Sequence, residues 1–318
     1  MRQYIVKRLL FLIPTAVGVY TLIFVLIRIV PGDIVTLFLE EGGGGGSSKA
    51  AEYIRKQLNL DKPIHIQYLL SIKDIFTTGS LGRSFQDDSP VMKGIWERLP
   101  VTGELALMTV LISISIALPV GIIAAVKQDT AGDYTARVLG IISLATPNFW
   151  LATLVVVFPG IWWNYSPPVI YKYWYEDPMV NLQQMLPAAL VLGTGTAGSV
   201  SRYVRSQVLE VLRQDYIRTA RSKGLRERAV IIRHTLKNAM IPVVTVVGLQ
   251  IAGALSGSVI AETIFNLPGL GNLTIGSINQ RDYPQLQANI FFFSIIIVMM
   301  NLIVDLAYGW LDPRVRYH

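Results

Sequence analysis

A glycine-rich stretch near the amino terminus carries the residue types that hold phosphate in nucleotide-binding loops. It reads EEGGGGGSSKA over residues 40–50. A phosphate loop needs Gly, four residues, then Gly-Lys-Ser/Thr, so that backbone N–H groups wrap the phosphates and the lysine reaches them. Here Lys49 follows the serines, and Gly-Lys-Ser/Thr occurs nowhere in the chain. The stretch therefore indicates a flexible linker, natural or engineered, and not an ATP site.

Side chains that carry enzyme chemistry are otherwise scattered. The three histidines lie far apart, without carboxylates at metal-ligand spacing, and no nucleophile stands with a base and an orienting acid. The chain has no cysteine, which excludes thiol chemistry and disulfides. We therefore expect no catalytic residue, no metal site and no cofactor bound by this chain, and a membrane enzyme is disfavoured.

Two polar residues, Asn301 and Asp305, lie four apart in the last long apolar run. An acid at membrane depth is costly unless it faces protein or water, so the pair is a candidate for a transport pathway. A hydrogen bond between helices explains it equally well.

Small residues mark places where helices can approach closely. Gly193 precedes Ala197 by four residues, and Gly253 and Gly257 form a GxxxG pair. Close helix packing explains these glycines, and a second interpretation is that their two segments line a polar pathway.

The segment from Leu212 to Val244 places eight basic residues in a chain that is otherwise poor in charge. Asp215 is expected to cap a short helix through Tyr216 to Lys223, with Gly224 as its left-handed stop. A second helix should follow, because Leu225, Ala229, Ile232 and Leu236 repeat at helical spacing.

Anionic lipid, nucleic acid or plain solvation could each account for such a basic face. None of them requires a glycine between two helices together with an apolar stripe. We therefore favour docking to another protein.

The elements that position these residues are membrane helices. The chain has 318 residues, of which 52% are hydrophobic and 15% charged, and long apolar runs occur near residues 9–30, 102–126, 137–160, 238–262 and 287–311, with a weaker run at 185–201. The first run follows a basic start, but it is longer than a signal-peptide core and no cleavage site follows, so a retained helix is expected.

Six spans with a cytoplasmic amino terminus place 17 of the 28 Lys and Arg residues inside. The positive-inside rule thus favours both termini being cytoplasmic and explains the net charge of +7 without nucleic acid. Residues 31–100 then lie outside. They hold the glycine loop, a short helix after Ser48 and an amphipathic helix over residues 64–76.

The segment DYIRTARSKGL resembles the EAA loop of ABC importer permeases, in the version found in the dipeptide/oligopeptide/nickel permease family. Arg218, Thr219 and Ala220 occupy the EAA positions and Gly224 the glycine; the chain departs from the general pattern at Arg218 and at Lys237, as that branch does. Further resemblances run in order through the whole chain: residues 7–33, LNLDKPIHIQYL, GSLGRSF, ERLPVTGELAL, ATPNFWLA, LPGLGNL, RDYPQLQA and NLIVDLAYGWLDPRVRY.

The resemblance implies an all-α permease of the type I ABC importers, with six transmembrane helices, in a prokaryotic plasma (inner) membrane. It further implies pairing with a second, homologous permease, docking of two cytoplasmic ATPases that bind ATP and Mg, and an extracytoplasmic binding protein that delivers a peptide, nickel or another small solute. The docking loop would comprise Asp215, Tyr216, Arg218, Thr219, Ala220, Arg221, Gly224 and Leu225.

Three parts are expected. Residues 1–30 form the cytoplasmic end and first helix, residues 31–100 the extracytoplasmic segment, and residues 101–318 a five-helix core with its coupling loop at about 206–237. The rival from another class is a secondary transporter or channel driven by an ion gradient. It would need inverted repeats, broken helices and an intramembrane ion site.

Overall fold

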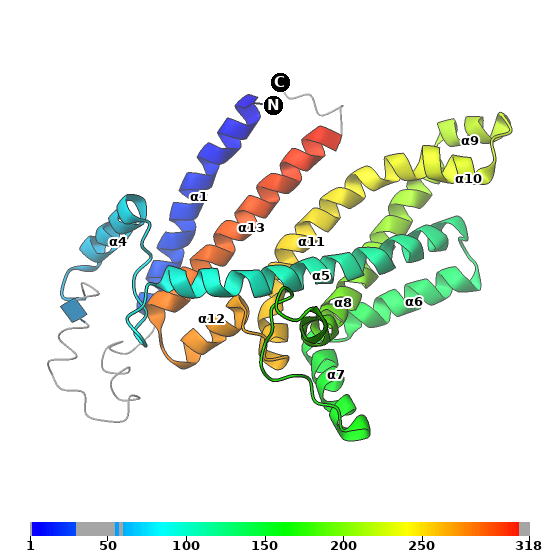
Figure 1. Cartoon of the computed structure of the whole chain (residues 1–318). Coiled ribbons are helices and arrows are strands. Elements are labelled where there is room, and N and C mark those ends of the chain that lie inside the picture. Colours follow the sequence, from blue (N-terminus) through cyan, green and yellow to red (C-terminus); the bar gives the residue numbers. More distant parts are fainter. Residues whose placement is uncertain (1, 30–54, 57–59, 312–318) are drawn as a thin grey trace.

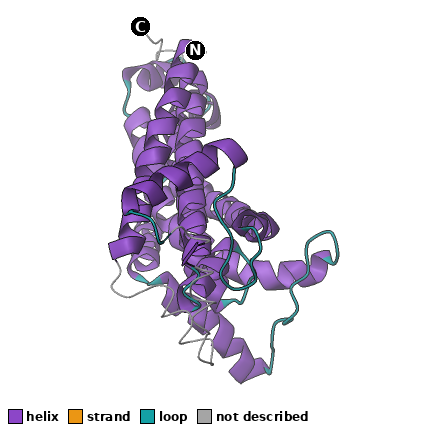
Figure 2. Ribbon diagram, turned by 90° about the vertical axis from the view of Figure 1, so that its left-hand side faces the viewer, coloured by secondary structure: helices purple, strands orange, loops and turns teal. Residues whose placement is uncertain are grey.

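The computed structural model describes residues 2–29, 55–56 and 60–311. Within these residues all regular secondary structure is helical, apart from one isolated β-bridge between Arg83 and Pro90, and loops connect the helices (Figure 2). The glycine stretch and the helix expected after Ser48 lie outside the described residues.

The long helices correspond in order to the apolar runs, and shorter helices lie between them (Figure 1). They are α1 (Arg2–Ile29), α4 (Ile64–Thr78), α5 (Val91–Val126), α6 (Ala131–Ala145), α7 (Asn148–Trp163), α8 (Pro178–Leu212), α9 (Asp215–Ser222), α10 (Glu227–Ala229), the π-helix η1 (Val230–Leu236), α11 (Lys237–Ile264), α12 (Leu270–Asn279) and α13 (Tyr283–Leu311).

Among the described residues, four helices are long and apolar enough to cross a membrane, and five spans result if the bent pair α6–α7 counts as one. The weak run at 185–201 lies in α8, a 35-residue helix. Helix α5 has 36 residues, and at 1.5 Å per residue it is longer than a bilayer core of about 30 Å requires.

Helices α5 and α8 pack along each other at the centre of the fold, and α6 and α11 also pack on α8. On the other side α13 lies between α11 and α1, so that the first and last helices run side by side (Figure 1). Buried side chains of α5 and α8, including Leu105, Met185 and Val204, form the core between them.

The apolar run at residues 137–160, expected as one span, folds as two helices, α6 and α7. The chain bends by 91° between α6 and α7. Pro147 has no N–H to continue a helix, and it biases the preceding residue toward extended backbone. Thr146 accordingly adopts φ −81° and ψ 120°.

The amphipathic helix expected over residues 64–76 is confirmed as α4. Its Tyr68 hydroxyl lies 2.6 Å from the Thr21 hydroxyl of α1, and the Tyr68 ring meets Phe24 edge to face, with centroids 5.3 Å apart. Ile64, at the start of the helix, is exposed, whereas Tyr68 is half-buried. Helix α4 therefore packs on α1 through its middle and leaves its start open.

Candidate functional site

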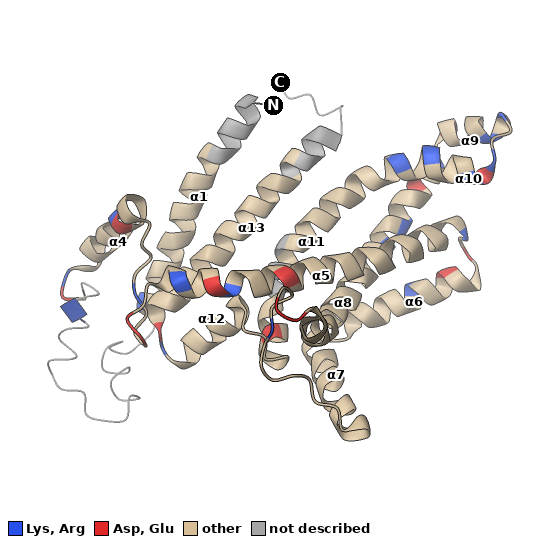
Figure 3. Cartoon of the chain, in the orientation of Figure 1, with Lys and Arg blue, Asp and Glu red and all other residues tan. Residues whose placement is uncertain are grey.

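The basic segment after α8 folds into a compact elbow, by which we mean residues 213–236. It consists of α9, a turn at Gly224, α10 and η1, and it stands at one tip of the fold (Figure 1). Figure 3 shows Lys and Arg gathered there, on a chain whose central helices carry few charges.

Gly224 ends α9 in the left-handed conformation, as predicted, with φ +75°. The Gly224 N–H donates to the Arg221 carbonyl at 2.9 Å, and the Leu225 N–H donates to the Ala220 carbonyl at 3.4 Å. This pair of bonds is the Schellman arrangement, which satisfies the last carbonyls of a helix. A Cβ at Gly224 would meet nothing within 4 Å, so the demand for glycine comes from the backbone and not from crowding.

A small apolar core holds the elbow together. Ile217 and Ala220 of α9 pack on Val230 of η1, with Val211 of α8 beside them. Ala220, expected among the docking residues, is 7% exposed and belongs to this core.

Within this chain the second helix leaves part of the predicted apolar stripe exposed. Leu225 and Ile232 are exposed, Ala229 and Leu236 are half-buried, and the buried residues are Val230 and Thr235. Residues 230–236 form a π-helix, in which residues five positions apart lie on the same side. The Thr235 hydroxyl also donates to the Val230 carbonyl at 3.2 Å. The predicted stripe assumes α-helical spacing, and the wider turn of the π-helix changes which residues share a face. This segment also continues directly into α11.

The exposed face of the elbow carries most of the other predicted docking residues: Asp215, Tyr216, Arg218, Thr219, Arg221 and Leu225. Asp215 is not the cap of α9. Gln214 takes that position without a side-chain bond, and Asp215 stands in the first turn, 3.3 Å from Arg218. A carboxylate in the first turn interacts favourably with the positive end of the helix dipole.

An ion pair closes the turn from outside. The Arg221 guanidinium donates to both oxygens of Glu227, at 2.7 and 3.2 Å, a forked arrangement that fixes geometry as well as charge. This hydrogen bonding raises the pKa of Arg221 above its ordinary value. The elbow thus presents charged side chains at its surface, and the turn at Gly224 holds the backbone that carries them.

Comparison with known proteins assigns the chain to a protein family. The profile described as "Binding-protein-dependent transport system inner membrane component" matches residues 117–317, and the profile of the corresponding amino-terminal region matches residues 1–106. The chain belongs to this family.

Relatives of this permease match it over its whole length. It is 36% identical over 340 residues to the dipeptide transport system permease protein DppB of Escherichia coli K12, covering 100% of this chain and 99% of the relative. It is 37% identical over 327 residues to DppB of Bacillus subtilis 168, with the same coverage.

Solved structures share the fold. The MetNI methionine ABC transporter, in an inward-facing conformation, matches with a TM-score of 0.58 at 17% identity, over 70% of this permease and 97% of that chain. An amino acid ABC transporter matches with a TM-score of 0.52 at 14% identity, over 71% and 94%.

The residues proposed for a pathway lie on three helices, α8, α11 and α13. Gly193 lies where α8 meets α5, and a Cβ there would come within 2.8 Å of Ile112, so close packing accounts for it. Gly253 is exposed, with nothing within 4 Å of a Cβ, so it mediates no close approach within this chain. Asn301 is exposed on α13. The surroundings of Gly257 and Asp305 lie outside the described side chains.

Sequence reasoning missed a buried acid, Glu262, near the end of α11. It is fully buried. Its carboxylate accepts the Thr102 hydroxyl at 2.8 Å and the backbone N–H groups of Gly271 and Asn272 at 2.7 and 3.2 Å. The Thr102 oxygen in turn accepts the Leu270 N–H at 2.8 Å. The first N–H groups of α12, which have no partner within the helix, are thereby satisfied by α11 and α5.

The motif LPGLGNL was the available signal for this contact. A Cβ at Gly269 or Gly271 would overlap the Glu262 carboxylate. The two glycines therefore make room for the acid that caps α12.

A second missed acid, Asp282, joins two of the motifs that had no assigned role. It is buried and accepts the Ser84 hydroxyl and the Phe85 N–H, so the segment GSLGRSF rests on the turn between α12 and α13. The Gln86 side chain strengthens this contact by donating to the Gln280 carbonyl at 3.0 Å.

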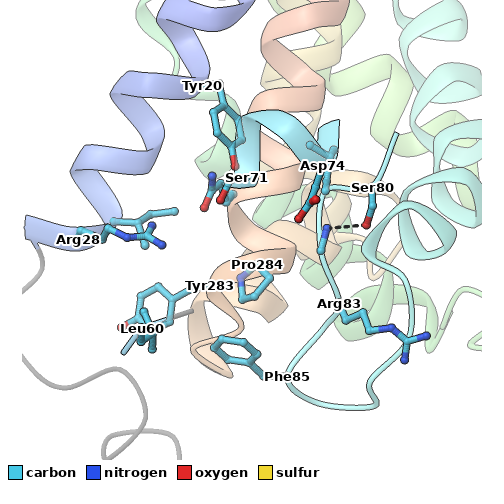
Figure 4. A pocket seen from close by; sticks show the side chains of 14 residues that line it. Tyr20, Arg28, Leu60, Ser71, Asp74, Ser80, Arg83, Phe85, Tyr283 and Pro284 are labelled. Carbon is cyan, nitrogen blue, oxygen red and sulfur yellow. Dashed lines mark hydrogen bonds between the residues drawn. The ribbon is translucent and has the colours of Figure 1, made fainter. Parts of the chain in front are cut away.

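Beside this contact lies a polar cavity of about 290 Å³ between α1, α4 and the start of α13. Figure 4 shows Arg28 and Asp74 on different sides of it, and Pro284 of α13 is among the residues that line it. Arg28 also donates to Gln67 at 3.1 Å, which ties α1 to α4. Among the described residues, no group of three or more His, Asp or Glu side chains could hold a metal ion.

Proposed function

We propose that the permease forms, with a second homologous permease subunit, the membrane pathway of an importer that takes up short peptides. A binding protein outside the cell delivers the peptide, and two cytoplasmic ATPases dock on the elbows of the two permeases and supply the energy. The permease binds no cofactor itself; ATP and Mg belong to the ATPases.

The elbow is the observation that carries this proposal. An exposed helix of eight residues, α9, is held rigidly by the Gly224 turn, the Ile217–Val230 core and the Arg221–Glu227 pair. Rigidity matters because a displacement at the surface reaches the membrane helices only if the elbow does not absorb it. The elbow continues into α8 on one side and into α11 on the other, so both would move with a docked partner.

The charge distribution supports a topology of six spans, formed by α1, α5, α6–α7, α8, α11 and α13, with both termini in the cytoplasm. Residues 31–100 form the extracytoplasmic segment, and residues 101–318 the core with its coupling loop. The plasma membrane of a prokaryote is the expected location.

Peptides are favoured as the substrate because full-length relatives are dipeptide permeases. Nickel complexes and other small solutes are the alternatives that the test includes. An ion-gradient transporter has less support, since the chain belongs to the family of binding-protein-dependent transport components and its full-length relatives are permeases of dipeptide transport systems.

The experiment uses host cells with and without the gene. Labelled dipeptide uptake is measured, with nickel and free amino acids as competitors, and the tagged permease is purified to identify co-purifying ATPases. We expect uptake to require the gene, to survive a protonophore while ATP is maintained, and to be competed by unlabelled peptides. Uptake that stops with the proton gradient at constant ATP, or a permease that carries no ATPases, would overturn the proposal.

A further inference from the structure

A buried ion pair joins α6 to α8 beside the elbow. The Asp133 side chain, in the first turn of α6, has no exposed area. Arg205 of α8 donates to its two oxygens at 2.7 and 2.8 Å, and Arg137 donates at 3.1 Å. The Asp129 N–H also donates to it, at 3.0 Å. The carboxylate is thus surrounded by donors and held in a forked bond to the other helix.

The rest of α6 meets α8 almost backbone to backbone. A Cβ at Gly198 would lie 2.8 Å from the Gly140 carbonyl oxygen and 3.0 Å from the Ser143 hydroxyl oxygen, so the absence of a side chain at Gly198 lets the two helices approach closely. Farther along, the Ser143 hydroxyl donates to the Thr194 carbonyl at 2.7 Å. Helix α6 is therefore fastened to α8 near both of its ends and in the middle.

The close approach at the glycines and the single Ser143–Thr194 hydrogen bond hold the two helices together. A forked Arg–carboxylate bond also fixes their relative rotation and register, because it is satisfied in one arrangement. Buried polar pairs are best attested in this role of fixing register.

Arg205 lies about two turns before Leu212, where α8 ends and the elbow begins. At its far end α6 is followed by the 91° bend into α7. The firm connection of α6 is therefore the one to α8, the helix that leads to the elbow.

We propose that Asp133 and Arg205 are positioning residues that make α6 and α8 one rigid lever, which moves as a unit when the elbow is displaced. This inference rests on the coupling role proposed above for the elbow. Without the pair, the end of α6 nearest the elbow loses its fixed position on α8, and ATP hydrolysis no longer produces the full movement of the pathway.

The first test compares variants in the purified importer. Arg205→Gln removes the forked bond. The double variant Asp133→Leu/Arg205→Met replaces the pair by apolar side chains, which commonly preserve stability. Arg202→Gln, an exposed arginine on the same helix, is the matched control. We expect the amount of ATPase subunits that co-purify with both pair variants to stay within about twofold of wild type. The maximal uptake rate should fall by about tenfold, and the half-saturating peptide concentration should not change.

These outcomes separate the lever from a folding role. Loss of ATPases in parallel with uptake, or wild-type uptake in the double variant, would overturn the inference. A wild-type importer without ATPases would instead refute the proposed function.

The second test needs no change in the pair. Because the chain has no cysteine, spin labels can be placed at will on the exposed positions Val138→Cys of α6, Ser206→Cys of α8 and Ile303→Cys of α13. We expect the 138–206 distance to stay constant between nucleotide-free and ATP-bound importer, and the 138–303 distance to change. A change in 138–206, or constancy of both distances in an importer that transports, would contradict the lever.

Discussion

Gly224 shows how one residue determines whether the elbow can present its surface. Its φ of +75° lies in the left-handed region, where an ordinary L-residue costs about 1–2 kcal/mol and a β-branched one more. Open space around it means that size by itself is no obstacle. The conformational preference of the new residue should therefore govern the outcome.

We expect Gly224→Val to unsettle the turn, to reduce ATPase co-purification about fivefold or more, and to leave membrane insertion unchanged because the spans pack elsewhere. Gly224→Asn should stay close to wild type, since asparagine tolerates this conformation. Arg213→Glu, a charge change at an exposed residue before α9, is the control and should do less. Equal retention of ATPases by the valine and asparagine variants would show that the turn is not needed for docking.

Glu262 is a buried acid that accepts hydrogen bonds from two backbone N–H groups and one hydroxyl group. Its replacement by alanine leaves the N–H groups of Gly271 and Asn272 and the Thr102 hydroxyl without an acceptor, each at a cost of about 1–3 kcal/mol. We expect Glu262→Ala to lower the unfolding temperature of the purified permease by at least several degrees. Glu262→Gln, which keeps one acceptor oxygen, should lower it less. An alanine variant as stable as wild type would mean that water or a shifted side chain replaces the carboxylate.

At the scale of elements, the structure shows where helices begin. Helix α8 starts with a cap that is recognisable in the sequence, because Asp177 directly precedes Pro178. The Asp177 carboxylate accepts hydrogen bonds from the N–H groups of Met179 and Val180, both at 3.1 Å. Loss of such a cap typically costs about 0.5–2 kcal/mol.

We expect Asp177→Ala to destabilise the permease by that amount, seen as a modest fall in the thermal unfolding midpoint in detergent. Asp177→Asn keeps an acceptor oxygen and should be nearly neutral. Uptake should change little in either variant, because the cap lies at the opposite end of α8 from the elbow. A strong loss of uptake at unchanged stability would instead assign Asp177 to the pathway.

The whole molecule has its first and last helices side by side and its basic elbow at one tip (Figures 1 and 3). With most Lys and Arg assigned to one side, we expect reporters after His318 and at Lys223 to be cytoplasmic. Reporters inserted in residues 42–48 should be outside. Protease access and alkylation of introduced cysteines measure both, and a cytoplasmic signal from the glycine stretch would contradict the six-span topology.

Much of this permease follows from local sequence. Apolar runs located the long helices, because a helix that crosses a membrane must be apolar over its own length. The Gly224 turn and the α4 helix were predictable for the same reason: each depends on residues within a few positions of one another. The resemblance to importer permeases also needed nothing beyond the order of short motifs.

Only the tertiary structure decided which distant residues meet. Thr102 and Glu262 are 160 positions apart, and Asp133 and Arg205 are 72 apart, so no helical period connects either pair. Hydropathy likewise could not show the 91° bend, since it reports how apolar a run is and not its direction. The π-helix moved the buried face of the elbow by changing the period on which the prediction relied. Buried charges acquire their role from partners that three-dimensional packing brings together, and that information is absent from any single segment.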